Sequence, residues 1–377
     1  MTDGQHTDPA ISNDIEICHP FKTKILEAKR RWATKYSNAS HLWSKVKTVT
    51  GSTSLDPISH LLDSFENDYL AANAINDYFT SVFVKSHDIA HFNDNSIAWD
   101  IHFTAHSIEH AILHQSLRKS PGSDTIPIFI YHCVSDIISA PLADIFNLSV
   151  QSQVFPHYWK HSHTIPIPKC KKPSMKDLRP ISLLNFCGKL FEKLVFNNIK
   201  EELYPLFGAH QFGFRKNSST STALLSLHEH ITSHLDNLTV SGIQLFVFDY
   251  SKAFDKLRFD VIAASLVKAN LPYQFINWIC SYLTNRTQCT RVNNTFSNVS
   301  TITSGIPQGS ILGPALFNIV LGSLKSICNS TCMVKYADDN TLSIPVFHST
   351  NNVIPEINNV IHFSDENGLF LNYTKCE

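Results

Sequence analysis

Along much of the chain, apolar residues recur every three or four positions, which is the spacing of amphipathic helices. A further helix is expected to begin near Pro314, because proline is favoured at the first helical position. Ser218 to Thr222 carry hydroxyl groups that can cap the helix after them. The segments expected to be helical on their spacing are 58–84, 126–132, 140–152, 186–203, 260–270, 273–283 and 355–365.

Between these helices, apolar or alternating runs predict strands at 159–168 and 243–248. A hairpin is expected over 290–303, turning at Asn293-Asn294. A turn and a strand are expected at 367–375.

A second hairpin is expected over 334–346, where apolar, β-favouring residues lead into Asp338 and Asp339 and resume at Leu342. A tight turn holds both carboxylates with little freedom. Adjacent carboxylates repel each other unless a cation neutralises them, and Mg²⁺ prefers oxygen ligands of this type. The turn is therefore a candidate Mg²⁺ site. A solvated acidic turn without metal is the commoner occurrence of Asp-Asp and stays open on these residues alone.

The chain has 377 residues, of which 43% are hydrophobic, enough for two or three domains with proper cores. It contains no apolar run long enough to span a membrane and begins with a polar segment in place of a signal peptide. These features predict a soluble intracellular protein. The nine cysteines show no paired spacing, so neither a disulfide framework nor a zinc site is expected from their pattern.

The formal net charge of -1 hides a strong segregation of charge. Residues 22–47 carry eight basic side chains against one acidic, and residues 156–216 carry eleven against four. The rest of the chain is correspondingly acidic. Such segregation fits a phosphate-binding surface beside an acidic metal site, although charge runs are more often solvated faces.

Two further patterns allow a functional and a structural interpretation. Residues 21–49 interleave basic residues with tryptophan and tyrosine, which suits nucleic acid but is more often packing. Four histidines recur every fourth residue, a spacing that places residues on one face of a helix. Ser107 is the expected N-cap, however, and with this cap His102 and His106 precede the helix. No carboxylate or cysteine stands at ligand spacing, so an exposed polar face is favoured over a metal site for His102, His106, His110 and His114.

Seven short motifs also occur in a fixed order along the chain. The downstream group ends with Tyr336-Ala337-Asp338-Asp339, and the complete set lies at 119–122, 165–169, 179–182, 211–215, 248–255, 305–314 and 336–339. This series resembles the fingers and palm motifs of reverse transcriptases from non-LTR, LINE-type retrotransposons, over roughly residues 105–377. A single motif of this length is weak, but seven in the family's order are specific.

The resemblance implies that Asp249, Asp338 and Asp339 ligate two Mg²⁺ ions, for which Mn²⁺ can substitute, with the Tyr250 carbonyl completing the coordination. It also implies that Lys375 protonates the departing pyrophosphate as a general acid. The candidate catalytic residues are therefore Asp249, Asp338, Asp339 and Lys375.

The same resemblance assigns roles in substrate binding. Phe254 is implied to be an aromatic floor that excludes a 2′-hydroxyl group, with ordinary core packing as the alternative. Gln308 and Gly309 are implied to line the nucleotide and template pocket, where glycine allows close approach. Lys169 and Arg179 are expected to grip the triphosphate. The residues expected to contact nucleic acid are Lys171, Lys172 and Arg215. Either of the two lysines could also take the role of Lys169.

The implied fold is α+β, a right-hand polymerase fold with fingers and palm, in which helices back a small antiparallel palm sheet. The expected divisions are a disordered lead-in at 1–20, a helical N-terminal extension at 21–104, fingers with the start of the palm at 105–240, and palm at 241–377. Since the chain stops directly after the palm motifs, the thumb is expected to be missing. Ser123 stands where the family often has proline.

The resemblance thus implies an RNA-directed DNA polymerase that extends a DNA primer on an RNA template with deoxynucleoside triphosphates. The alternative is a catalytically silent remnant that binds nucleic acid; intact Asp249, Asp338 and Asp339 favour the enzyme, and the expected loss of the thumb favours the remnant. Either the nucleus or the cytoplasm is expected as the compartment, no membrane partner is expected, and the oligomeric state is left open.

Overall fold

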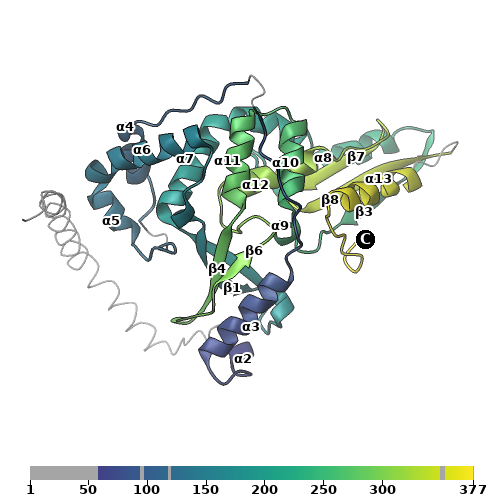
Figure 1. Ribbon diagram of the computed structural model, residues 1–377. Helices are drawn as coiled ribbons and strands as arrows, with labels where there is room; N and C mark the ends of the chain where they lie inside the picture. The colour runs from purple at the N-terminus through teal and green to yellow at the C-terminus, as the bar shows by residue number, and fades with distance from the viewer. Residues whose placement is uncertain (1–57, 94–96, 118–119, 349–352, 377) are drawn as a thin grey trace, which may run out of the picture.

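The computed structural model of the chain describes residues 58–93, 97–117, 120–348 and 353–376. The lead-in expected at 1–20 and the basic, aromatic segment at 21–49 lie outside these residues. Within them, helices and strands form a mixed α/β architecture with two separate sheets. In Figure 1 the larger sheet lies below a layer of helices and the smaller sheet extends to the right. No helix in the described ranges is long and apolar enough to cross a membrane.

The α-helices of these residues are α2 (Ser59–Leu62), α3 (Asp68–Ser81), α4 (Ala105–Leu113), α5 (Ile128–Cys133), α6 (Ser135–Ser152), α7 (Phe186–Leu203), α8 (Thr220–Leu235), α9 (Ala253–Lys256), α10 (Phe259–Lys268), α11 (Tyr273–Leu283), α12 (Gly313–Gly322) and α13 (Val353–Glu366). Short 3-10 helices are η1 (His157–Trp159), η2 (Met175–Asp177) and η3 (Tyr204–Phe207). The strands are β1 (His161–Pro168), β2 (Leu178–Leu184), β3 (Val240–Phe248), β4 (Arg286–Val292), β5 (Thr295–Phe296), β6 (Ser300–Ile302), β7 (Cys332–Tyr336) and β8 (Asp339–Phe347).

The larger sheet joins strands from two distant parts of the chain. Its order is β2-β1-β4-β5, and β6 also pairs with β4. Strand β1 is antiparallel to β2 and parallel to β4. Helix α3 packs on one face, where the buried amide of Asn76 accepts from Gln288 (3.2 Å) and Thr290 (3.0 Å) and donates to Ser300 (2.8 Å). These bonds satisfy a buried polar group and fix the helix on the sheet.

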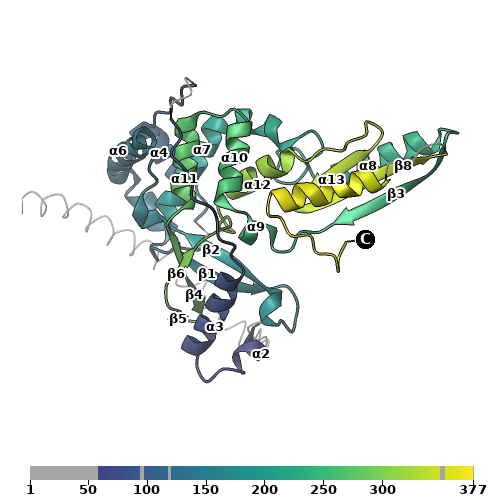
Figure 2. The same ribbon diagram turned by 45° about the vertical axis from the view of Figure 1, so that its right-hand side comes forward.

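The smaller sheet is antiparallel, with the order β3-β8-β7. Alternate residues face opposite sides of a strand. On one side Met333, Leu342 and Ile344 join the main hydrophobic core, whereas on the other Cys332 and Val334 pack against α8. Helix α13, whose apolar side chains also belong to the main core, lies along the core side of this sheet (Figure 2).

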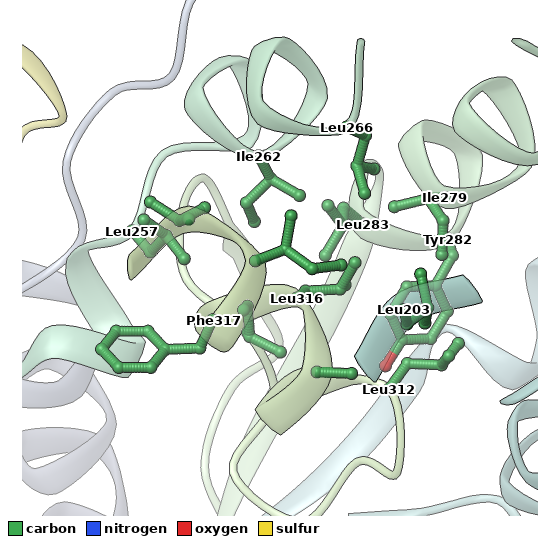
Figure 3. Close-up of a cluster of buried hydrophobic side chains, with 14 of the residues drawn as sticks. Leu203, Leu257, Ile262, Leu266, Ile279, Tyr282, Leu283, Leu312, Leu316 and Phe317 are labelled. Atoms are coloured by element: carbon green, nitrogen blue, oxygen red, sulfur yellow. The ribbon is translucent and has the colours of Figure 1, made fainter. Parts of the chain in front are cut away.

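The main core is centred on α12, in which every residue except Pro314 is buried. A helix that is apolar all round has to be enclosed by other elements. In Figure 3, Leu316 of α12 lies among Ile262 and Leu266 of α10 and Leu283 of α11. This packing holds the loop before α12 and the start of β7 in fixed positions.

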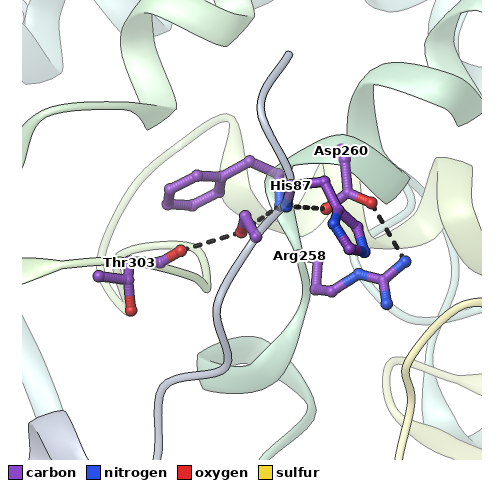
Figure 4. Close-up of polar contacts among 6 residues, drawn as sticks. His87, Arg258, Asp260 and Thr303 are labelled. Carbon is purple, nitrogen blue, oxygen red and sulfur yellow. Dashed lines mark hydrogen bonds and ion pairs between the residues drawn. The ribbon is translucent and has the colours of Figure 1, made fainter.

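After α3, the strap (residues 82–93) runs extended across the start of α10. The Ser86 hydroxyl donates to the backbone carbonyl after β6 at 2.9 Å. The His87 backbone N–H donates to Asp260 at 3.2 Å, and the other carboxylate oxygen of Asp260 pairs with Arg258 at 3.1 Å (Figure 4). The strap therefore links α3, on the larger sheet, to α10.

Several predicted elements are confirmed. Helices α7 and α11 have the bounds predicted at 186–203 and 273–283, and α12 begins at Gly313, next to the expected first-turn proline. Ser219 caps α8 as the serine and threonine run indicated. Both predicted hairpins are present, with turns at Asn293-Asn294 and at Ala337-Asp338.

Other helical predictions need correction. The single helix expected over 58–84 is interrupted, because Asn67 accepts a hydrogen bond from Leu70 N and starts α3 anew. Ser107 is not the N-cap of α4: Thr104 is, and Ser107 completes a capping box from inside the helix. The histidine repeat that includes α4 is exposed, as predicted.

Two more boundaries differ. Helix α6 begins at Ser135, well before the expected residue 140, and keeps Pro141 inside it. Its buried residues, Phe146 among them, outweigh the missing backbone hydrogen bond. The strand expected within 367–375 is a turn, joined to the end of β3 through an isolated bridge between Leu371 and Tyr250.

Candidate active site

The smaller sheet brings three aspartates together at one end. Phe248 pairs with Asn340 across β3 and β8, so the same register carries Asp249 opposite Asp339. Asp338 lies in the turn between β7 and β8, after Ala337 with a φ of 57°. Residues directly opposite each other in an antiparallel pair have side chains on the same face. Carboxylates 90 positions apart in the chain are therefore neighbours.

A buried glutamine holds this turn in place. Gln211 is 1% exposed, and its Oε1 accepts from the backbone N–H groups of Gly213 (2.8 Å) and Ala337 (3.1 Å). Its Nε2 donates to the Ala337 carbonyl at 3.3 Å. A Cβ on residue 213 would lie 2.2 Å from the Ala337 nitrogen, so only glycine allows this approach. The 211–215 motif thus acts as a support for the acidic turn.

The chain after α13 returns to Asp249. The Asn372 N–H donates to the Asp249 carbonyl at 2.8 Å, and its side-chain amide donates to Oδ2 at 3.0 Å. Lys375 Nζ lies 3.2 Å from the same carboxylate oxygen, with the lysine side chain 63% exposed. The turn at 367–375 therefore delivers the predicted general acid to the predicted metal ligand.

The negative charge of the three aspartates is only partly neutralised by Lys375. Burial raises the pKa of Asp339, and the charges of Asp338 and Asp249 raise it further, while Lys375 opposes them. Within the described residues, the three aspartates do not form a ligand cluster compact enough for one ion, and Asp249 contacts Asn372 and Lys375. As a donor set, carboxylate oxygens nevertheless fit hard divalent cations such as Mg²⁺.

Two of the three aspartates, Asp249 and Asp338, line a cleft of about 1350 Å³ between the two sheets, whereas Asp339 lies outside its lining. Asp249, Asp338 and Lys375 lie on one side, while Lys169 and Arg179, from the ends of β1 and β2, lie on the other. Burial, followed by the charges of Arg179, Lys375 and Lys252, lowers the pKa of Lys169. The basic residues that line the cleft are Lys85, Lys169, Lys176, Arg179, Lys252, Lys256 and Lys375.

An aromatic side chain and a buried acid form the inner wall of the cleft. Phe254 lines it and stacks on Phe317 of α12, with ring centroids 4.6 Å apart. Gln308 also lines it and donates to Asp255 at 2.7 Å; burial raises the pKa of Asp255. The wall is therefore both rigid and partly apolar.

Gly309 lies against β2. Its φ is +131°, and a Cβ at this position would lie 2.6 Å from the Ser182 carbonyl oxygen. The preceding carbonyl, of Gln308, accepts from Ser182 N at 2.8 Å. The close approach of this loop to β2 thus requires glycine. Through it, the segment that leads into α12 is connected to the larger sheet.

Not all predicted contact residues line the cleft. Lys171 and Lys172 are exposed beside Lys169 but lie outside its lining. Arg215 also lies outside it, and its guanidinium donates to the Gly208 carbonyl at 3.2 Å within its own turn. Tyr250 lines the cleft through the end of β3, while its ring is buried and burial raises the pKa of its hydroxyl to about 12.

Sequence reasoning missed one contact in the cleft. Lys252 has a φ of 53°, and its Nζ donates to the Tyr78 hydroxyl at 2.5 Å and lies 4.1 Å from the centroid of that ring. Tyr78 belongs to α3, so the N-terminal helices form part of the cleft wall. The spacing of α3 gives no signal for this contact, which depends on how the helix packs on β4.

With this geometry in place, the chain can be compared with known proteins. Residues 167–377 match the family model described as reverse transcriptase (RNA-dependent DNA polymerase). The chain belongs to the reverse transcriptase family. The predicted resemblance to the enzymes of non-LTR retrotransposons is confirmed by curated relatives from such elements.

Among these relatives is the probable RNA-directed DNA polymerase from transposon BS of Drosophila melanogaster, 32% identical over 65% of this chain and 27% of that protein. The RNA-directed DNA polymerase from mobile element jockey of the same species is 27% identical over 72% of this chain and 31% of that protein. This reverse transcriptase chain thus spans less than a third of their length. A solved apo telomerase from Candida Tropicalis, truncated from its C-terminal domain, is 14% identical, with a TM-score of 0.43 over 64% of this chain and 54% of that chain.

Proposed function

We propose that this chain catalyses RNA-directed DNA synthesis, extending a DNA primer on an RNA template with deoxynucleoside triphosphates. The observation that carries the proposal is the position of Asp249 opposite Asp339, with Asp338 in the same cleft as Lys169 and Arg179. Metal-assisted phosphoryl transfer needs acidic side chains that hold the metal ions and, facing them, basic side chains that bind the triphosphate.

In this proposal Asp249, Asp338 and Asp339 would hold two Mg²⁺ ions, with the Tyr250 carbonyl as a further ligand, and Mn²⁺ could substitute. The bound ions supply Lewis-acid stabilisation of the charge that develops on the attacking and leaving oxygens. The primer 3′-hydroxyl loses its proton to solvent and its oxygen forms a bond to the α-phosphorus as the bond to the pyrophosphate oxygen breaks. Lys375 donates a proton to that departing oxygen, and its present contact with Asp249 keeps it within the site.

The remaining cleft residues select and position the substrate. Lys169 and Arg179 pair with the triphosphate, for which charge-assisted hydrogen bonds are strong. Phe254, fixed by its stack on Phe317, excludes a 2′-hydroxyl group and so favours deoxynucleotides. Gln308 and Gly309 line the pocket for the nucleotide and the template base, and glycine lets the backbone come close to them. Lys171, Lys172 and Arg215 lie outside the cleft lining, and we assign them to the nucleic acid strands beyond it.

We further propose a right-hand arrangement for the two sheets. The larger sheet with residues 105–240 corresponds to fingers, and the smaller sheet with residues 241–377 to palm. Strands β4 to β6, although within the second range, complete the larger sheet by pairing with β1. Of the N-terminal extension expected at 21–104, the structure describes residues 58–93 and 97–104, and helix α3 of this part packs on that sheet.

Primer extension on an RNA template tests the proposal. Asp338→Asn is expected to abolish Mg²⁺-dependent extension, because an amide removes one charge without changing the size of the side chain. Asp365→Asn is the matched control, since Asp365 is an exposed aspartate on α13 outside the cleft lining. Extension that survives Asp338→Asn would overturn the metal assignment.

Binding of a fluorescent RNA-DNA hybrid distinguishes the alternative. If the unsubstituted chain binds the hybrid but does not extend it in Mg²⁺ or Mn²⁺, the chain is a nucleic-acid-binding remnant of a reverse transcriptase. If Asp338→Asn binds the hybrid normally and fails only in extension, the polymerase proposal is supported.

A further inference from the structure

The larger sheet carries a group of soft ligand atoms away from the cleft. His161 and His163 lie two residues apart on β1, so both side chains face the same side of the sheet. In the parallel pairing of β1 with β4, His163 is opposite Cys289 and His161 is opposite Thr287. The two strands are adjacent in Figure 1. Two imidazoles and a thiol are thus held by regular backbone pairing.

The spacing of these atoms fits a metal ion. One ligand atom from each of His161, His163 and Cys289 lies within 4.8 Å of the other two. His161 Nε2 lies 3.7 Å from Cys289 Sγ. Tetrahedral zinc, with Zn–S near 2.3 Å and Zn–N near 2.0–2.1 Å, separates a sulfur from a nitrogen ligand by about 3.6 Å.

The surroundings also suit a bound cation of this type. His161 and His163 are both half-buried on the face of the sheet that carries Cys289. Cys289 is 5% exposed and free of any disulfide. Thr287 Oγ1 lies 2.9 Å from His161 Nδ1, the ring nitrogen that points away from Cys289. Metal-ligating histidines commonly have such a partner, which fixes the ring orientation.

We propose that His161, His163 and Cys289 form a zinc site that clips β1 to β4, with solvent completing the tetrahedral coordination. Thiolate and imidazole ligands select Zn²⁺ over the hard Mg²⁺ expected at the aspartates. On binding, the Cys289 thiol releases its proton to solvent and the sulfur lone pair forms the bond to the metal. Thr287 is a positioning residue that orients His161.

This site does not depend on the proposed polymerase activity. None of the three ligands lines the cleft, and His163 precedes Lys169 by six residues, or about 20 Å of extended chain at about 3.3 Å per residue. Its consequence is structural: a metal clip between residues so distant in sequence closes a long loop and stabilises the sheet that carries Lys169 and Arg179. Zinc is therefore expected to raise the melting temperature.

The test uses the full chain, freed of any affinity tag and of metal by a chelator, in reducing buffer. Co²⁺ is added first as a spectroscopic probe, and we expect a thiolate-to-cobalt charge-transfer band with tetrahedral d–d absorption. Zn²⁺ affinity is then measured by competition with a chromophoric chelator. Cys289→Ser is expected to lose the charge-transfer band and to weaken zinc binding more than tenfold. Thr287→Val is expected to weaken it about tenfold, as for other partners of metal-ligating histidines.

Cys332→Ser is the matched control, because Cys332 is also buried and free but lies on β7 of the smaller sheet. It is expected to keep the cobalt spectrum and the rise in melting temperature. Circular dichroism checks that each variant is folded, and His163→Gln, at a half-buried position, replaces any variant that is not. A charge-transfer band or zinc affinity that is unchanged in Cys289→Ser, or in His163→Gln, would overturn the proposal, as would failure of the unsubstituted chain to bind zinc.

Discussion

Lys335 offers a sharp test of the electrostatics behind the acidic turn. It lies on β7, three residues before Asp338, and is only 4% exposed. Its Nζ donates to the carbonyl oxygens of Leu321 and Leu324, at the end of α12, at 2.6 and 2.5 Å. Burial, and to a smaller extent the charge of Lys325, lowers the pKa of Lys335 from 10.5 to about 7.

The direction of the effect on stability follows from proton binding. Between pH 7 and pH 10.5 the unfolded chain keeps the lysine proton and the folded chain loses it, so the free energy of unfolding rises with pH. The rise is at most about 1.36 kcal/mol per pH unit, or about 2.7 kcal/mol over two units. The two carbonyl contacts favour the charged amine and oppose burial, so we expect about half of this, roughly 1.4 kcal/mol.

The assay is urea unfolding followed by circular dichroism at pH 7 and pH 9. The unsubstituted chain is expected to gain about 1.4 kcal/mol more over this interval than Lys335→Met, which has no proton to lose. The exposed Lys268→Met, on α10, serves as the matched control and is expected to behave like the unsubstituted chain. Equal pH dependence of Lys335→Met and the unsubstituted chain would refute the reasoning.

Three further substitutions probe the cleft. Gly309→Ala is expected to lower the free energy of unfolding in urea by about 1–3 kcal/mol, because residue 309 has a φ of +131° and an added Cβ would lie 2.6 Å from the Ser182 carbonyl oxygen. Gly242→Ala, where a Cβ meets nothing within 4 Å, is the neutral control. An equal loss of stability in both variants would contradict this reasoning. Phe254→Val opens space on the cleft wall and is expected to raise ribonucleotide use relative to deoxynucleotide use about tenfold in single-nucleotide extension, so an unchanged ratio would argue against the steric role. Lys375→Gln is expected to lower kcat for nucleotide addition about a hundredfold through loss of the general acid, and an effect confined to KM would assign the lysine to binding alone.

Local signals predicted much of the secondary structure. The uninterrupted apolar spacing of α7 and α11 is strong enough to give both ends correctly. The start of α4 was less certain from sequence, because Thr104 and Ser107 are both good caps and only the capping box that joins them decides which residue is first. The start of α6 predicted at residue 140 is wrong, since burial of the helix overrides the loss of one backbone hydrogen bond at Pro141.

The site could be predicted only in part, because its residues meet through long-range pairing. Motif resemblance picked out Asp249, Asp338 and Lys375, and the strand register and the turn after α13 bring them to one cleft. The contact between Lys252 and Tyr78 joins residues 174 positions apart, and no periodicity of either segment encodes it. The proposed zinc ligands could not be predicted for the same reason, since the cysteine and the histidines come from strands that pair across 126 residues.

The strap carries a mechanical consequence for the cleft. It begins at the end of α3, which is fastened to the larger sheet, and it is bonded to α10 through His87 and Asp260. Any movement of α3 relative to α10 therefore changes the distance that this segment has to bridge. Hydrogen bonds between side chain and backbone can break one at a time. The strap therefore opposes such a movement gradually instead of stopping it at one fixed distance.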